Sequence, residues 1–195
     1  MPSNLRKKLP RSFYNRPTIE VARDLIGKYI VYNSPGGKMS ARIVEVEAYI
    51  GQDDPACHAA RGKTRRNAVM FGKPGFSYIY FIYGMYHCLN FVTEKEGQAA
   101  AVLLRAAEPC EGIEIMMPQS PNQKEYRLLS GPGKFCRAFG LTREQNGLDL
   151  TGNLLYLEDR RTGSVNVGQT PRIGINHGTE LLWRFYDTDS DAVSR

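Results

Sequence analysis

Two glutamates and a tyrosine alternate along one short segment of the chain, RIVEVEAYI. Side chains in residues 41–50 follow a period of two, the spacing that places alternate residues on opposite faces of a β-strand. Ile43, Glu45, Glu47 and Tyr49 then share one face. The other face carries Val44, Val46, Ala48 and Ile50. Two carboxylates beside an aromatic ring can activate a water molecule next to a flat substrate, or they can bind a cation.

A long loop follows this strand and adds further polar groups. Residues 51–75 are rich in glycine, proline and charged side chains, a composition that predicts little regular structure. Asp53, Asp54 and His58 lie within a few positions of the strand end. This group fits a general base with an aromatic wall, or an oxygen-and-nitrogen site for a divalent metal. The spacing leaves both interpretations open.

An aromatic hairpin is expected over residues 76–91, where two strand-like runs flank Tyr83, Gly84 and Met85. A ring at a hairpin tip has little to pack on in its own fold, but it can fill the gap left by an extruded nucleotide. Gly84 and Met85 would allow a close approach to a groove. The other rings are expected in a buried sheet: Tyr78, Tyr80, Phe81 and Tyr86. Tyr83 therefore favours a nucleic-acid substrate.

Basic side chains are concentrated between the strand and the hairpin, at Arg61, Lys63, Arg65 and Arg66. A duplex held at the hairpin would place its phosphates near this run. Lys134 follows a Gly-Pro-Gly sequence at an expected helix start, and it is another candidate phosphate contact. The chain has 26 Lys and Arg against 20 Asp and Glu, a formal charge of +6 that suits a polyanionic partner.

The remaining pattern predicts an α+β fold around an antiparallel sheet. An amphipathic helix begins at Pro17 and Thr18 and ends at Gly27. Further strands are expected at residues 28–33, 99–106, 154–158, 172–176 and 182–187, and short helices near residues 111–117 and 133–139. The length of 195 residues suits one domain, of which residues 1–12 are expected to be a flexible basic N-terminus.

Several classes of protein are disfavoured by what the sequence lacks. The four cysteines form no CxxC pair, which predicts free buried thiols in place of a zinc or redox site: Cys57, Cys88, Cys110 and Cys136. No apolar run approaches the roughly 18 residues of a membrane span, and no apolar signal segment follows the basic start. We therefore expect a protein that is neither secreted nor bound to a membrane.

Four segments of the chain together resemble a known family: RIVEVEAYIG, KPGFSYIYFIYGMYHCLNF, VLLRAAEP and LSGPGKFCRAF. In order and spacing they are similar to the alkyladenine, or 3-methyladenine, DNA glycosylases, over about residues 18–186. The resemblance implies a single domain with a curved antiparallel core, flanking helices and a protruding hairpin that enters the minor groove. It also implies a base-excision-repair enzyme that flips damaged purines from duplex DNA and hydrolyses the N-glycosidic bond, leaving an abasic site. The lesion class comprises 3-methyladenine, 7-methylguanine, hypoxanthine and ethenoadenine.

The resemblance assigns a role to each matching residue. Glu47 would activate the water as general base, and Arg105 would help to hold it. The purine-binding residues would be Tyr49, which stacks on the base, His58, which donates a hydrogen bond, Tyr80, and Asn90, which rejects the 2-amino group of guanine. Tyr83 would be the intercalating wedge. The other expected DNA contacts are Gly84, Met85, Tyr86, Thr64, Met70 and Lys134.

The implied enzyme is a monomer that needs neither cofactor nor metal, and its partner is double-stranded DNA containing damaged purines. It would act in the cytoplasm, at the nucleoid, in a bacterium, or in the nucleus of a eukaryote. No lysine replaces or adjoins Glu47, so a covalent imine with the sugar is not supported. The rival classes are a divalent-metal-dependent nuclease, a bifunctional glycosylase with strand cleavage, and a non-catalytic binder of kinked DNA.

Overall fold

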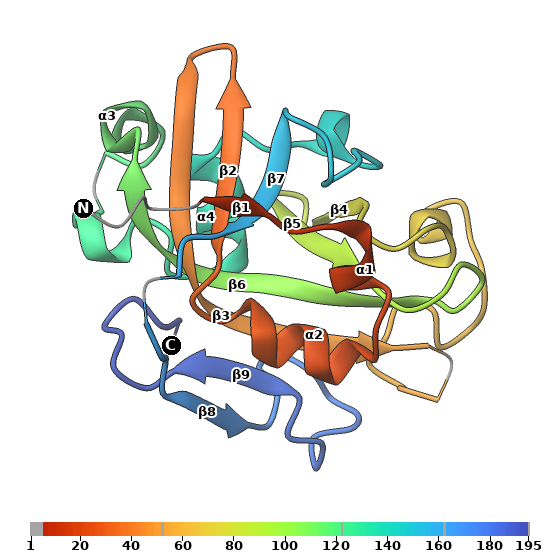
Figure 1. Ribbon diagram of the computed structural model, residues 1–195. Coiled ribbons are helices and arrows are strands. Elements are labelled where there is room, and N and C mark those ends of the chain that lie inside the picture. The colour runs from red at the N-terminus through yellow and green to blue at the C-terminus, as the bar shows by residue number, and fades with distance from the viewer. Residues whose placement is uncertain (1–5, 52, 122, 162, 195) are drawn as a thin grey trace.

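The computed structural model describes residues 6–51, 53–121, 123–161 and 163–194. Within these ranges, nine strands form one antiparallel sheet in the order β1-β7-β2-β3-β6-β5-β4, while β9 pairs with both β3 and β8 (Figure 1). The strands are β1 (Lys7–Lys8), β2 (Tyr29–Ser34), β3 (Gly37–Ile50), β4 (Ser77–Ile82), β5 (Tyr86–Val92), β6 (Ala100–Glu111), β7 (Leu155–Asp159), β8 (Val167–Thr170) and β9 (Arg184–Asp187). The predicted α+β class with an antiparallel core is confirmed.

Short helices complete the described part of the chain. The α-helices are α1 (Arg11–Tyr14), α2 (Thr18–Leu25), α3 (Ile113–Met116) and α4 (Pro132–Ala138). The 3-10 turns are η1 (Ala68–Phe71), η2 (Met117–Gln119), η3 (Glu125–Arg127) and η4 (Arg143–Gln145). None of these helices is long and apolar enough to cross a membrane.

Strand β3 lies between β2 and β6 in the middle of the sheet, and it is strongly bent. Along one edge its first half pairs with β2 and its second half with β9, whereas β6 accompanies its other edge from Ser40 to Ile50. Figure 1 shows β3 and β6 turning together from the part of the sheet beside β2 to the part beside α2. The predicted curvature of the sheet is present, and it brings the end of β3 under the hairpin.

A β-bulge near Glu45 changes which side of β3 faces the core. The pairing with β6 shifts between Ile43 and Glu45 and again between Glu45 and Val46. Ile43 and Val46 both lie in the main hydrophobic core, while Val44 packs in a small separate cluster with Ala106. The prediction that Ile43 shares a face with the glutamates is therefore wrong, because irregular pairing, with two residues of β3 opposite two of β6, interrupts strict alternation.

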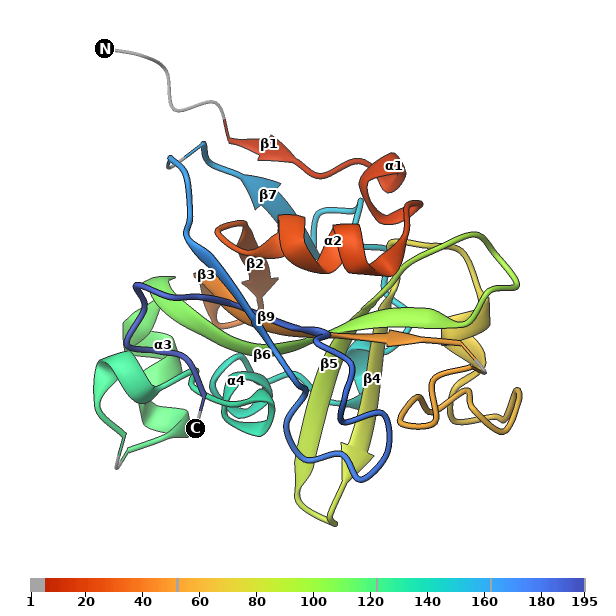
Figure 2. The same cartoon turned by 90° about the horizontal axis from the view of Figure 1, so that it is seen from below.

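Helices cover both faces of the central strands. In Figure 2, α2 lies on one side of β3 and β6, and α4 lies with the hairpin on the other. Helix α2 begins after Pro17, and the carboxylate of Glu94 accepts from the Thr18 N–H at 2.7 Å. The ring of Phe135 in α4 stacks on that of Phe139, the residue that follows the helix, at 4.3 Å. Burying such side chains supplies the main free energy that holds these helices to the sheet.

Strands β4 and β5 form a hairpin that projects from the body of the molecule, and the segment joining β8 to β9 runs beside it (Figure 2). At its tip, Tyr83 and Gly84 have φ angles of 54° and 67°. The Met85 N–H closes the turn on the Ile82 carbonyl at 3.2 Å. Two successive positive φ angles match the right-handed twist of a hairpin, which explains the glycine. The predicted hairpin is present with Tyr83 at its tip.

Two sequence predictions fail at the ends of the chain. Within the expected flexible N-terminus, residues 6–12 are ordered: β1 pairs with β7, and the Leu9 N–H donates to the Leu157 carbonyl at 2.8 Å. Residues 1–5 lie outside the described residues. Residues 172–176 are not a strand, because Gly174 has a φ of 74° and interrupts an extended backbone. Strand β8, at Val167–Thr170, carries no alternating apolar pattern that would have predicted it.

Candidate active site

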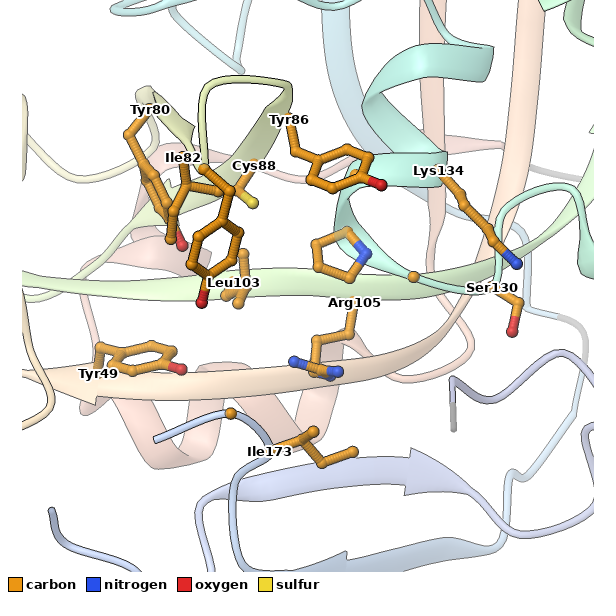
Figure 3. Close-up of a pocket in the computed structure, with 15 residues that line it drawn as sticks. Tyr49, Tyr80, Ile82, Tyr86, Cys88, Leu103, Arg105, Ser130, Lys134 and Ile173 are labelled. Atoms are coloured by element: carbon orange, nitrogen blue, oxygen red, sulfur yellow. The ribbon is translucent and has the colours of Figure 1, made fainter. Parts of the chain in front are cut away.

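A cavity of about 390 Å³ lies between the hairpin, the start of α4 and the β8–β9 connection. Figure 3 shows Tyr49, Arg105 and Ile173 on one side of this cavity and Tyr80, Tyr86 and Lys134 on the other. The remaining lining residues are Ile82, Tyr83, Cys88, Leu103, Ser130, Gly131, Pro132, Gly133 and Gly174. Its walls are thus largely aromatic and apolar, as suits a flat ring.

Glu47 lies buried beside this cavity, held by three of the residues around it. Its Oε2 accepts from the Tyr49 hydroxyl at 2.8 Å and from Arg105 Nη1 at 3.3 Å. Its Oε1 accepts from the backbone N–H of Ile173 at 2.7 Å. The carboxylate is 0% exposed. It is therefore fixed in orientation, as a general base must be.

Burial raises the pKa of Glu47 above its ordinary value, although Arg105 and the hydrogen bonds from Ile173 and Tyr49 oppose this shift. A raised pKa makes a carboxylate a better proton acceptor. Burial and the neighbouring Glu47 also raise the pKa of Tyr49. The phenol therefore stays protonated and remains a hydrogen-bond donor to Glu47.

Arg105 is fixed by a second carboxylate, Glu45. Arg105 Nε lies 2.9 Å from Glu45 Oε1, and Arg184 Nε lies 2.7 Å from the same oxygen. Ser194 closes the network, because its N–H donates to Glu45 Oε2 at 2.6 Å and its hydroxyl lies 3.1 Å from Arg105 Nη2. Glu45 is thus occupied by ion pairs behind Glu47.

A smaller cavity of about 130 Å³ adjoins the first and shares Tyr49, Tyr80, Ile82 and Gly174 with it. It is lined by His58 and Asn90, so the structure brings all four predicted purine-binding residues to two adjoining cavities. The other lining residues are Ala56, Met70, Tyr78 and Ile175. The Asn90 amide donates to the Tyr78 carbonyl at 3.0 Å, which fixes this side chain.

His58 is held by two tyrosines. Its Nδ1 lies 2.9 Å from the Tyr78 hydroxyl, and its ring lies edge-on to Tyr80 with centroids 4.4 Å apart. Burial lowers the pKa of His58 to about 4, with a further contribution from the charge of Arg66. The imidazole is therefore neutral near pH 7. If the tyrosine donates to Nδ1, then Nε2 carries the proton and is the available donor.

The predicted DNA contacts divide into exposed and buried residues. Tyr83 is 78% and Met85 63% exposed at the hairpin tip. Thr64 is also exposed, in the loop after β3. Tyr86 is half-buried and packs on Gly133, where an added Cβ would lie 2.7 Å from its ring. Met70 is 2% exposed and lines the smaller cavity from a buried cluster, so it lies inside the protein and not on its outer surface.

The sequence interpretation missed the residues that orient the site from a distance. Ile173 reaches Glu47 through its backbone N–H, and Ser194 lies far from Glu45 along the chain. No motif marks such contacts. Asp54, considered as a metal ligand, is instead paired with Arg172 at 2.6 Å. Within the described ranges, no group of three or more His, Cys, Asp or Glu side chains is placed to hold a metal ion.

The cysteines are free throughout the described chain, as predicted, but one differs in burial. Cys57, Cys88 and Cys136 are buried, whereas Cys110 is exposed. Cys110 lies at the end of β6, where the sheet meets solvent.

Comparison with known proteins identifies the class of enzyme to which this site belongs, the monofunctional DNA glycosylases, which are hydrolases of N-glycosyl bonds active in base-excision repair. The profile of the methylpurine-DNA glycosylase family matches residues 12–191. The chain belongs to that family.

Individual relatives agree over nearly the whole chain. A protein of Methanocella arvoryzae, provisionally named a 3-methyladenine DNA glycosylase, is 54% identical over 96% of both chains. Relatives with the same name from Alkaliphilus oremlandii and Wolbachia sp. subsp. Brugia malayi are 47% and 51% identical. They cover 96% and 91% of this chain and 99% and 95% of their own.

Proposed function

We propose that the protein binds double-stranded DNA, turns a damaged purine out of the helix and hydrolyses its N-glycosidic bond, leaving an abasic site. The substrates are alkylated or deaminated purines, namely 3-methyladenine, 7-methylguanine, hypoxanthine and ethenoadenine. The observation that carries the proposal is Glu47, a wholly buried carboxylate held by three donors beside an aromatic cavity with room for a two-ring base. The names of the relatives support the first of these substrates.

Extrusion of the nucleotide is assigned to the hairpin. Tyr83 stands exposed at its tip, where little of its ring is packed against the protein. Inserted between base pairs, the ring replaces the stacking that the extruded purine gave up. Met85 and Gly84 lie against the DNA groove beside this ring. The DNA backbone is contacted by Tyr86, Lys134 and Thr64. Flipping costs a few kcal/mol and costs least for damaged bases, so selection begins before the pocket is reached.

Recognition of the extruded purine is assigned to the two cavities. Tyr49 and Tyr80 offer aromatic faces, and methylation at N3 or N7 makes a purine cationic, which such faces attract. His58 donates from Nε2 to an acceptor on the purine edge. Asn90, which lines the smaller cavity, is assigned the exclusion of the 2-amino group of guanine. The pocket therefore acts as a second filter after extrusion.

Hydrolysis is assigned to Glu47 with Arg105. A water molecule held by both attacks the sugar C1′ and gives its proton to the Glu47 carboxylate. The C1′–N9 bond breaks, and its electron pair leaves with the purine. A cationic methylated purine departs as a neutral base, whereas hypoxanthine needs a proton from solvent or the protein as it leaves.

Single-lesion duplex oligonucleotides test the proposal. Each is incubated with the protein, with and without EDTA, and the abasic sites are converted to strand breaks with alkali. We expect breaks only after alkali, at the lesion, and equally with EDTA. Intact substrate in every case would reduce the protein to a DNA binder. Strand breaks that vanish with EDTA would identify a metal nuclease. A covalent protein–DNA adduct trapped by borohydride would identify a bifunctional glycosylase.

A further inference from the structure

A buried ion pair supports Tyr49 from behind. Arg172 Nη1 lies 2.6 Å from Asp54 Oδ2, and Arg172 Nη2 lies 2.8 Å from Asp54 Oδ1, so the pair is bidentate. Both side chains are 0% exposed. The guanidinium stacks between two rings, 4.7 Å from the centre of Tyr49 and 5.0 Å from that of Trp183. Arg172 lines neither cavity, so it contacts the part of the Tyr49 ring that faces away from them.

The pair also joins three segments that build the site. Arg172 Nη1 donates to the carbonyl of Ala48, next to Tyr49 on β3, at 2.9 Å. The residue after Arg172 is Ile173, whose N–H holds Glu47 at 2.7 Å. Asp54 accepts from the Ala56 N–H at 3.0 Å and so shapes the loop that carries His58. A single ion pair thus sets the positions of the general base Glu47, the stacking ring of Tyr49 and the loop that carries His58.

Stability alone explains this pair poorly. Taking two charges out of water costs several kcal/mol per ion, and apolar replacements are often as stable. The Nε of Arg172 is buried and has no hydrogen-bond partner within the described residues, so the arginine is not placed to satisfy all of its donors. Its planar group is instead placed to satisfy Asp54 and to stack on Tyr49 and Trp183.

We propose that Asp54 and Arg172 form a positioning pair for the purine site: Arg172 supports the Tyr49 ring and the Ile173 N–H, and Asp54 neutralises the charge behind that ring. This inference rests on the proposed glycosylase function. Neutralisation matters because an unpaired cation behind Tyr49 would repel a cationic purine stacked on its front face. A neutral purine would not be repelled. The pair therefore controls how strongly the pocket prefers cationic over neutral lesions.

Two lesions of opposite character test the inference in one duplex sequence, cationic 7-methylguanine and neutral hypoxanthine. Single-turnover excision rates are measured for the wild type, Asp54→Asn, Arg172→Lys and the charge-free double variant Asp54→Asn/Arg172→Gln. In Asp54→Asn we expect the ratio of 7-methylguanine to hypoxanthine excision to fall about tenfold. The double variant should regain the wild-type ratio at lower rates. Arg172→Lys keeps the charge but loses the planar support, so both rates should fall about tenfold together.

The matched control is Asp187→Asn, which breaks another partly buried pair, with Arg42 at 2.7 Å, away from both cavities. It should lower the melting temperature and leave the ratio unchanged. An unchanged ratio in folded Asp54→Asn, or an equal change in Asp187→Asn, would overturn the positioning pair. Should Asp54→Asn not fold, Arg172→Lys decides, since full activity per folded molecule would equally overturn it.

The same measurements distinguish a failure of the positioning pair from a failure of the proposed glycosylase function. A wild-type protein that releases neither base would refute the glycosylase and the inference with it. A wild-type protein that releases both, with the same ratio in every variant, would refute the positioning pair alone.

Discussion

The hydroxyl of Tyr49 donates a 2.8 Å hydrogen bond to Oε2 of Glu47, two residues before it on the same strand. The ring proposed to stack on the purine and the carboxylate proposed to activate water are thereby locked to each other. With its polar end occupied by Glu47, the ring presents only its apolar face to a bound base. Placement of the base and placement of the attacking water are therefore coupled through one contact.

Replacing Glu47 by Gln should abolish most of the chemistry while retaining binding. The amide keeps the size of the side chain but cannot accept a proton, so single-turnover excision should fall by about 10² to 10⁴. Lesion affinity, measured by fluorescence anisotropy, should stay within a few-fold of wild type. A variant that excises at the wild-type rate would remove Glu47 from the mechanism.

Removing the Tyr49 hydroxyl should shift the pH dependence of excision. Glu47 must be ionised to accept a proton, so the rate falls as pH drops through its raised pKa. The hydrogen bond from Tyr49 lowers that pKa, and Tyr49→Phe should therefore move the acid limb of the rate profile to higher pH. Single-turnover rates from about pH 5 to pH 9 measure this. His58, with a pKa of about 4, should not contribute to the limb.

The raised pKa of Glu47 also predicts that folding stability changes with pH in the direction opposite to the excision rate. Because the folded pKa of Glu47 exceeds that of the unfolded chain, its contribution to stability is fully present below about pH 4.3 and is lost as pH rises through the folded pKa. Relative to Glu47→Gln, the wild type should become less stable over that window. Urea unfolding of both proteins at several pH values tests this, and parallel stability curves would argue against a raised pKa.

Shortening Asn90 should relax discrimination against guanine. The side chain is 4% exposed, lines the smaller cavity and is fixed by the Tyr78 carbonyl. In Asn90→Ser the space it fills becomes available to a 2-amino group, so excision of guanine from mispairs should rise relative to hypoxanthine. If the ratio of the two rates does not change, Asn90 does not contact that edge of the base.

Truncating Tyr83 should impair flipping and leave folding intact. Without the ring, the flipped state loses stacking of roughly 1 to 3 kcal/mol, which is about one to two decades in the flipping equilibrium. The expected result is weak 2-aminopurine fluorescence beside the lesion with Tyr83→Ala and an unchanged melting temperature. Tyr78→Ala provides the contrast, because Tyr78 is 1% exposed and its loss should cost about 3 to 5 kcal/mol of stability. A destabilised Tyr83→Ala that still flips the base would refute the wedge.

The sequence predicted those features that depend on local pattern. Helix α2, the paired strands and the hairpin tip follow from periodicity and from the Tyr-Gly turn. Burial of Glu47 and Glu45 could not be predicted in this way, because carboxylates on a strand are usually solvated. Here arginines from β6 and β9 compensate their charges. Residues 172–176 look like a strand because apolar residues alternate there. Their backbone is instead directed by the ion pair to Asp54 and the bend at Gly174.

The bulge in β3 gives one strand two phases of alternation. Before it, odd-numbered Ile43 points into the main core. After it, even-numbered Val46 and Ala48 do so, and the odd-numbered Glu47 and Tyr49 are left for the site. Deleting Val44 would leave only Glu45 between Ile43 and Val46, so one regular alternation would then serve the core and would keep Glu47 on the side of the site. The pairing with β6 would be lost instead, because Arg105 and Ala106 also separate the partners of Val46 and Ile43. The two residues between Ile43 and Val46 are thus matched by two residues of β6, one of which is Arg105, and a shorter segment would move the strand that carries Glu47 out of register with the strand that carries its arginine.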